Sequence, residues 1–370
     1  MPELNFDFAR ICDELGPIKV VHWNDPVTRV RGMVVVDSVA CGPSIGGVRM
    51  APDVTTSEVF RLARAMTLKN AAAGLPHGGG KAGIVADPKD VNKEHFVRAF
   101  ARAIRDLKEY IPGPDMGTNE ESMAWVHDEI GRSLGLPRVL GGIPLDEIGA
   151  TGFGLAECAQ VAVEFCSLDL KGARVAVQGF GSVGQHAARF LVKHGARLVA
   201  VNDLDGTVFD AAGIDVEALS QLKRKTGKVA SLPRGEKLSR DALFGVPCDI
   251  LIPAARPDCI HADNARDIKA KLVLQGANIP ATDDAERILY ERGIVNVPDF
   301  IANAGGVICA ALEYHGESET FAFDQIAAKI PRNTREILAR SREEKITPRE
   351  AAVRLALERV KTAMHYRRSG

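Results

Sequence analysis

The sequence predicts an α/β protein with two domains, and three observations support this prediction. The chain has 370 residues, which is more than one hydrophobic core usually organises. Apolar residues make up 46% of it and charged residues 26%, a globular composition. After about residue 145, short apolar strands alternate with helical stretches, which is typical of a parallel sheet. We expect a first domain over residues 1–145, a second over 146–324, and C-terminal helices in 325–370 that pack back on the first.

The charge and the cysteines exclude several classes of protein. A formal net charge of −1 offers no excess of either sign for binding a nucleic acid. No apolar run approaches the roughly 18 residues that cross a bilayer, and the acidic start of the chain lacks the basic residues of a signal peptide. The seven cysteines show no metal-ligand spacing. We therefore expect a cytoplasmic protein that binds no metal, no membrane and no nucleic acid.

A helix of about five turns is predicted between residues 55 and 73. Thr55 and Glu58 have the spacing of a capping box at its start. One face of the helix is formed by residues three and four apart, namely Leu62, Met66, Lys69 and Ala73. Lys69 is therefore expected on the buried stripe, where an ammonium group is costly unless it is paired or binds a ligand. A structural ion pair and a ligand contact are equally compatible with this position.

The other elements of the first domain surround this helix. Residues 30–41 are rich in valine and predict a strand, and residues 81–87, after a run of glycines, predict another. Residues 91–109 have the periodicity of an amphipathic helix. Proline and glycine in residues 110–118 predict an irregular loop that carries Asp115, which is either a functional group or a turn-forming residue.

The second domain contains a glycine motif in a specific context. Gly179, Gly181 and Gly184 form GxGxxG between an apolar strand and a helix, and Asp203 ends the next strand nineteen residues later. Glycines in this setting let a pyrophosphate approach the helix N-terminus, and the acid binds the adenosine ribose. The motif predicts a dinucleotide site. Asp203 favours NAD, but Asn202 and Asp205 leave the register open, so NADP is not excluded.

The predicted dinucleotide in the second domain carries hydride, and this suggests chemical roles for the lysines of the first domain. Lys69 on an apolar helix face suits a fixed substrate carboxylate. Lys81, which follows three glycines, can be desolvated and surrounded by positive charge, so that it acts as a base near neutral pH. With Asp115, these residues suit chemistry on an amine better than the arginine and histidine of a 2-hydroxy-acid dehydrogenase.

Linked motifs in order along the chain resemble the glutamate/leucine/phenylalanine/valine dehydrogenase family. They are GGVRM (46–50), MTLKNAAAGLPHGGGKAGI (66–84), PGPDMGT (112–118), ATGFG (150–154), QGFGSVG (178–184), QGAN (275–278) and PDFIANAGGV (298–307). The resemblance implies an N-terminal α/β domain for substrate binding and oligomerisation, and a Rossmann-type dinucleotide-binding domain, separated by an active-site cleft. It also implies a homo-oligomer, hexamer or octamer.

The implied activity is the NAD(P)-dependent, reversible oxidative deamination of an L-amino acid to a 2-oxo acid and ammonia. In the family pattern, Lys69 holds the substrate α-carboxylate, Lys81 activates water, and Asp115 moves protons to and from the amino group. The expected substrate site adds Ile45, Gly46, Gly47, Met66, Gly113, Asn303, Val307 and Ala310. The expected cofactor site consists of Thr151, Gly179, Phe180, Gly181, Ser182, Val183, Gly184, Asp203, Ala254, Ala255 and Asn278.

Two positions bear on the substrate. Glutamate dehydrogenases resemble this chain in GGVRM but carry a lysine before the paired glycines and a serine three residues after NAGGV. Ile45 and Ala310 occupy these positions here, and a glutamate side chain would then lack its partners. We therefore predict an apolar substrate, branched-chain or aromatic.

Other segments resemble the glutamate branch, namely residues 117–131 and ATGFG, so glutamate is the alternative substrate. A more remote alternative is a catalytically silent, dinucleotide-binding regulator. Loss of Lys81 or Asp115 would mark it, and both are present.

Overall fold

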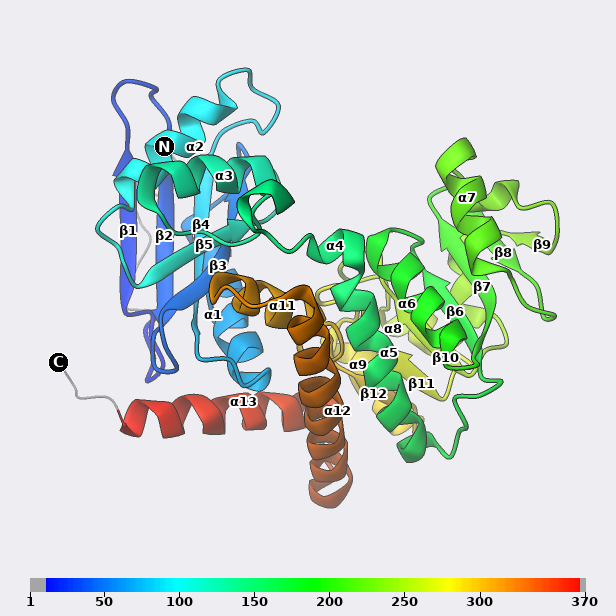
Figure 1. Ribbon diagram of the computed structural model, residues 1–370. Helices are drawn as coiled ribbons and strands as arrows, with labels where there is room; N and C mark the ends of the chain where they lie inside the picture. Colours follow the sequence, from blue (N-terminus) through cyan, green and yellow to red (C-terminus); the bar gives the residue numbers. More distant parts are fainter. Residues whose placement is uncertain (1–10, 367–370) are drawn as a thin grey trace. The chain divides into compact units, whose positions relative to one another are not determined.

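The computed structural model describes residues 11–366, and these divide into two compact units. Unit 1 contains the residues up to Pro144, Val307–Ala322 and those from Leu355 onward, and unit 2 contains Leu145–Gly306 and Phe323–Arg354. The predicted α/β architecture with two domains is confirmed (Figure 1). We expected Val307–Ala322 in the second domain and C-terminal helices in 325–370 that pack back on the first, whereas this division puts Val307–Ala322 in unit 1 and Phe323–Arg354 in unit 2.

Unit 1 is built on a five-stranded mixed sheet with the order β1-β2-β4-β3-β5. β3 is parallel to both of its neighbours, β4 and β5, while β2 is antiparallel to β1 and β4. The strands are β1 (Lys19–Asn24), β2 (Arg31–Ser38), β3 (Ser44–Met50), β4 (Gly78–Val85) and β5 (Tyr110–Pro114). The interior strand β4 therefore has a partner on each side.

Helices cover both faces of this sheet, and the alternation of side chains in β2 shows how. Val34 and Val36 belong to a core with α2 (Lys93–Ala103) and α3 (Glu120–Ile130). Met33 and Val35 point to the other face and pack with α1 (Thr56–Ala72). Because both faces are buried, β2 is a continuous apolar run, as expected for a strand between two helical layers.

The predicted helix around Lys69 exists as α1, but its buried face was predicted one position away. Its buried residues include Val59, Ala63, Thr67 and Asn70, while Lys69 is only partly buried. The N-cap is half of the predicted box: Thr55 Oγ1 accepts from the Glu58 backbone N–H. The Glu58 carboxylate contacts Arg49 instead of returning to the cap.

Two segments near the site are more regular than the sequence indicates. The glycine run is part of β4, because glycines fit where the strand meets α1 closely. The loop predicted from residue 110 is wrong in its first half, since Tyr110–Pro114 forms β5. Among residues 11–366, β5 pairs only with β3, and prolines are tolerated on such an edge strand because it needs fewer N–H donors.

The C-terminal region adds two helical segments to unit 1. Near the end of α11 (Gly305–Tyr314), the Glu313 carboxylate accepts N–H bonds from Gly135, Leu136 and Ile143 at 2.7, 3.0 and 3.0 Å. The end of α13 (Pro348–His365) is held by Arg359, which donates to the carbonyls that end α1.

Unit 2 is built on a seven-stranded sheet with the order β12-β11-β10-β6-β7-β8-β9. The first five strands in this order are parallel, and β8 and β9 extend the sheet in antiparallel fashion. The strands are β6 (Arg174–Gln178), β7 (Arg197–Asp203), β8 (Gly206–Phe209), β9 (Glu236–Leu238), β10 (Ile250–Pro253), β11 (Leu272–Leu274) and β12 (Val295–Val297). Chain order reverses at β6, and ligands of such sheets bind at the carboxyl ends beside that point.

The helices of unit 2 are α4 (Leu145–Ile148), α5 (Ala150–Ala162), α6 (Ser182–Lys193), α7 (Val216–Thr226), α8 (Ala262–Ala265), α9 (Asp283–Glu291), α10 (Asp299–Ala302) and most of α12 (Glu319–Glu344), whose first residues, up to Ala322, belong to unit 1. Residues of β6, β7, β10 and β11 pack with α8 and α9 in one core of unit 2. Among residues 11–366, no helix is long and apolar enough to cross a membrane.

Candidate active site

The centre of the unit 1 site is an ion pair between Lys81 and Asp115. Nζ of Lys81, on β4, lies 3.0 Å from Oδ2 of Asp115, directly after β5. Nε of Arg49, on β3, lies 2.9 Å from the same oxygen. Three strands thus bring two cations to one carboxylate, and only 7% of the Lys81 side chain is exposed.

The cluster shifts the pKa values of both Lys81 and Asp115. Burial lowers the pKa of Lys81 and Arg49 lowers it further, against the opposing attraction of Asp115. Burial alone would raise the pKa of Asp115, but Lys81 and Arg49 outweigh it and lower that pKa. Asp115 is therefore ionised at neutral pH, and Lys81 loses its proton more easily than a lysine in water.

Gly47 leaves room beside this pair. A Cβ atom at Gly47 would lie 2.7 Å from Cβ of Asp115 and 3.1 Å from Nζ of Lys81. At the neighbouring Gly46, it would lie 1.6 Å from the carbonyl oxygen of Gly80. The paired glycines thus allow close approach of β3 to β4 and keep side chains away from the charged groups.

Other predicted substrate residues lie on β3, α1 and α11. Ile45 is buried on β3, and Met66 and Lys69 lie partly buried on α1. Val307 and Ala310 lie on α11, one helical turn apart. These placements fit the predicted roles, which stay predictions.

Gly113 has a structural reason to be small. A Cβ atom at Gly113 would lie 2.5 Å from Cδ1 of Leu134. A larger residue there would therefore collide with the core of unit 1, so the size of residue 113 says little about the substrate.

The predicted dinucleotide residues gather at the carboxyl ends of the parallel strands of unit 2. Gly179 follows β6 with φ +86°, a conformation that favours glycine, and a Cβ there would lie 2.5 Å from Cβ of Ala255. Gly181 is the N-cap of α6, and a Cβ atom at this position would meet open space. Phe180 is buried, and Ser182, Val183 and Gly184 form the first turn of α6. A helix N-terminus without a capping side chain fits a pyrophosphate.

Asp203 is the last residue of β7, as predicted, and its carboxylate is partly used within the fold. Oδ2 accepts from the Val229 backbone N–H at 2.7 Å and lies 3.7 Å from Nζ of Lys223. Lys228 pairs with Asp205 instead. A carboxylate at the end of β7 favours NAD, because it can accept a hydrogen bond from a free ribose hydroxyl. Lys223 and Lys228 supply positive charge nearby, which would suit the additional phosphate of NADP.

The remaining predicted residues lie near each other beside β10 and β11. The backbone N–H groups of Ala254 and Ala255 donate to Gln178, at the end of β6. The side-chain amide of Asn303 donates to Oδ1 of Asn278 at 3.1 Å and contacts the Gly276 carbonyl at 3.2 Å. At the start of α5, Oγ1 of Thr151 lies 2.9 Å from where a Gly306 Cβ would be.

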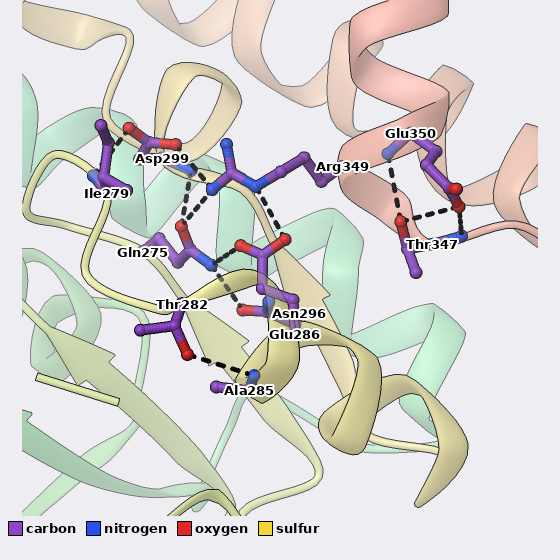
Figure 2. A network of polar contacts seen from close by, with 10 residues as sticks. All are labelled: Gln275, Ile279, Thr282, Ala285, Glu286, Asn296, Asp299, Thr347, Arg349 and Glu350. Atoms are coloured by element: carbon purple, nitrogen blue, oxygen red, sulfur yellow. Dashed lines mark hydrogen bonds and ion pairs between the residues drawn. The ribbon is translucent and has the colours of Figure 1, made fainter. Parts of the chain in front are cut away.

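A network of polar contacts, shown in Figure 2, holds Gln275 and Ile279, and the segment between these two residues contains Asn278. Arg349 donates to Glu286 at 2.7 Å, to Gln275 at 2.9 Å and to Asp299 at 3.0 Å. The other carboxylate oxygen of Asp299 accepts from the Ile279 backbone N–H at 3.0 Å. Both ends of this loop are thus fixed to one guanidinium group.

Three polar residues of these sites escaped the sequence analysis. Arg49 lies within the quoted motif GGVRM, so its charge beside the glycines was an available signal. Asn202, whose Oδ1 accepts from the Gly179 backbone N–H at 2.9 Å, was visible only as a neighbour of Asp203. Arg349 lies some seventy residues after the loop that it holds, and no local pattern marks it. In the described part of the chain, no group of three or more His, Cys, Asp or Glu residues could hold a metal ion.

Comparison with known proteins agrees with this geometry. Residues 17–132 match the model of the Glu/Leu/Phe/Val dehydrogenase dimerisation domain, and residues 141–368 match that of Glutamate/Leucine/Phenylalanine/Valine dehydrogenase. Glutamate dehydrogenase of Aeropyrum pernix is 40% identical over 89% of this chain and 84% of that protein. An NADP(+)-dependent glutamate dehydrogenase of Pyrobaculum calidifontis is 39% identical (97% and 91% covered), and an NAD-specific one of Staphylococcus aureus is 37% identical (99% and 94%).

Solved structures give the same result. The hetero-hexameric glutamate dehydrogenase of Thermus thermophilus, in a Leu-bound form, has a TM-score of 0.83 at 32% identity over 96% of this chain and 91% of that chain. The L-tryptophan dehydrogenase of Nostoc punctiforme has a TM-score of 0.76 at 25% identity over 95% and 97%.

A parallel sheet with a glycine turn in one unit and a lysine–aspartate pair in the other define an amino acid dehydrogenase, an oxidoreductase that acts on CH–NH2 donors. The chain belongs to the glutamate/leucine/phenylalanine/valine dehydrogenase family. The resemblance predicted from its motifs is thereby confirmed.

Proposed function

We propose that the protein converts an L-amino acid, water and NAD to the 2-oxo acid, ammonia and NADH, and catalyses the reverse reaction. The observation that carries this proposal is the buried contact between Nζ of Lys81 and Oδ2 of Asp115, with open space kept by Gly47. An acid and a base whose pKa values are shifted by the same cluster suit proton transfer to and from nitrogen and oxygen.

Each residue has a distinct task in this proposal. The Lys69 ammonium binds the α-carboxylate as a point charge. Asp115 accepts a proton from the α-amino group, and Lys81, once deprotonated, takes a proton from the water that attacks the imine carbon. Asp115 then returns a proton to the departing nitrogen.

The dinucleotide supplies the hydride acceptor when it is bound. The residues present fit it, because the N-terminus of α6 is uncapped, Gly179 takes a left-handed conformation and Asp203 ends β7. We propose that Asn278 and Thr151 contact the nicotinamide side. Asp203 supports NAD, while Lys223 and the NADP(+)-dependent relative keep NADP as the alternative.

Two substrates have specific support. Relatives at about 40% identity are named glutamate dehydrogenase, and these names favour glutamate over the apolar amino acids that we predicted from sequence. Ile45 and Ala310 favour an apolar side chain, since both are buried and offer no partner for a second carboxylate. Glutamate would then need a different cation on this chain.

The assay that tests the proposal is NADH formation at alkaline pH with NAD and, separately, L-glutamate, L-leucine, L-valine, L-phenylalanine and L-tryptophan. Activity with glutamate alone would support the relatives' names, and activity with the apolar substrates alone would support the argument from Ile45 and Ala310. No activity with any of the five, with NAD or NADP, would favour the dinucleotide-binding regulator instead.

The relatives also support an oligomer. One model that matches describes a dimerisation domain, and the Thermus thermophilus protein is a hetero-hexamer. We propose a homo-oligomer, with a hexamer as the first state to test by light scattering. The cytoplasmic location stays a prediction.

A further inference from the structure

Arg49 shares one carboxylate oxygen with Lys81. In the part of the chain that the structure describes, both side-chain contacts of Asp115 go to Oδ2, from Arg49 Nε at 2.9 Å and from Lys81 Nζ at 3.0 Å. The other oxygen, Oδ1, has no side-chain partner among the described residues. The two cations, however, differ in chemistry, because a guanidinium keeps its proton in proteins, whereas a buried ammonium can lose one.

Arg49 is itself held in place from the other side. Its Nη1 atom lies 2.5 Å from Oε1 of Glu58, in the first turn of α1. Because Nε and Nη1 belong to one planar fork, the contact with Glu58 fixes the direction from which Nε approaches Asp115. The cluster of Glu58, Arg49, Asp115 and Lys81 carries two charges of each sign.

A base that gives up and regains its proton changes its attraction for its neighbours in every cycle. When Lys81 is neutral, its amine can still donate a hydrogen bond to the Asp115 carboxylate, but the attraction between two opposite charges is lost. Without another cation, the carboxylate could rotate away at that step. Arg49 stays charged throughout and retains Oδ2.

We propose that Arg49 is a positioning residue, which anchors Oδ2 of Asp115 while the charge of Lys81 changes and so keeps Oδ1 directed at the substrate amino group. This inference rests on the proposed function for the roles of Lys81 and Asp115. Arg49 also weakens the hold of Asp115 on the Lys81 proton, since its positive charge opposes that of the ammonium.

A purely structural brace between β3 and α1 is the competing explanation. Glu58→Gln tests it, because this change weakens the brace but leaves Arg49 beside Asp115. A brace alone predicts the same outcome for Glu58→Gln as for Arg49→Met. Positioning predicts a much larger effect for Arg49→Met, with partial rescue by Arg49→Lys.

The first measurement does not require activity. The rate at which acetic anhydride modifies Lys81 is followed by mass spectrometry against pH in the whole protein without substrate. We expect the midpoint for Lys81 to rise by about one pH unit in Arg49→Met, because a like charge is removed and Asp115 is left to Lys81 alone. Arg61→Met, which removes an exposed arginine of α1, should leave the midpoint unchanged.

The second measurement is steady-state kinetics with the substrate found in the assay above. Arg49→Met should lower kcat by about tenfold or more with little change in KM for the amino acid, and Arg49→Lys should recover part of kcat. Thermal unfolding of each variant shows that it is folded.

The inference is overturned if the Lys81 midpoint in Arg49→Met equals that of the wild type, or if Glu58→Gln reproduces its effect in full. Should the wild type oxidise no amino acid, the proposed function fails, and the labelling experiment still reports on the contact.

Discussion

Nη2 of Arg349 lies 3.0 Å from Oδ1 of Asp299, and this contact joins the start of α13 to the loop that carries Asn278 (Figure 2). The other carboxylate oxygen of Asp299 accepts a hydrogen bond from the Ile279 backbone N–H, so Arg349 also restricts the position of Ile279. We predict that Arg349→Met lowers the free energy of unfolding by about 3 kcal/mol, because two buried carboxylates lose their cation.

The same variant should weaken NADH binding roughly tenfold, or about 1.4 kcal/mol, since the loop loses its fixed position. Fluorescence titration with NADH measures this. Arg292→Met is the matched control, because Arg292 donates to the carbonyls of Ala265 and Ile268 and not to this loop. Equal NADH affinities in the two variants would show that Arg349 serves stability alone.

Lys81→Ala should lower kcat by about three orders of magnitude, because it removes the proposed base. NADH affinity should stay at the wild-type value, since the predicted dinucleotide residues lie in unit 2. Stopped-flow kinetics and the NADH titration check the two parts. A variant that turns over at near wild-type rate would remove Lys81 from the mechanism.

Ile45→Lys should raise kcat/KM for glutamate relative to leucine by at least about tenfold, because it returns a cation to the position where the glutamate branch carries one. Ile45→Met controls for the longer side chain. If the lysine variant folds and its preference is unchanged, the side-chain pocket lies elsewhere.

Glu313→Gln should destabilise unit 1 by about 2 kcal/mol. The carboxylate accepts three backbone N–H bonds, and a glutamine amide has one oxygen, so at least one buried donor would face an NH2 group. Urea unfolding measures the change. Glu317→Gln, an exposed change beyond the same helix, should have no effect.

Burial lowers the pKa of His77, and the nearby His315 lowers it further, although the Pro43 carbonyl opposes both. Nε2 of His77 lies 2.9 Å from Nε2 of His315. A folded-state pKa below the unfolded value of about 6.5 means that unfolding takes up a proton in acid. Stability should therefore fall as the pH drops below about 6.5.

Thermal unfolding between pH 5 and pH 8 checks this prediction for His77. The loss of stability at low pH should be smaller in His77→Gln than in the wild type. It should equal that of the wild type in His95→Gln, which alters an exposed histidine of α2. Identical pH profiles for all three proteins would show that His77 does not contribute.

The sequence was sufficient where the chemistry is local. The glycine turn, the acid at the end of β7 and the lysine after the glycine run all follow from patterns within about thirty residues. The face of α1 was misplaced by one position because its core is lined by small and polar residues, Ala63, Thr67 and Asn70, which periodicity of large apolar residues does not detect.

Contacts between distant segments could not be predicted in the same way. The pairing of Arg49 with Asp115 depends on β3 lying between β4 and β5, which is a property of strand order and not of spacing. β5 itself was predicted as a loop, because the rule that proline interrupts strands does not apply at a sheet edge.

The position of β4 between two partners also bears on how the site fluctuates. Lys81 pairs with Val35 of β2, and β3 pairs with β4 at Gly79 and again at Ala82, so most amides of β4 should exchange slowly with deuterium. β5 lies at the border and should exchange earlier through local opening. Lys81 is thus carried by an interior strand, while Asp115 directly follows an edge strand, so local opening should loosen the Asp115 side of the pair before the Lys81 side.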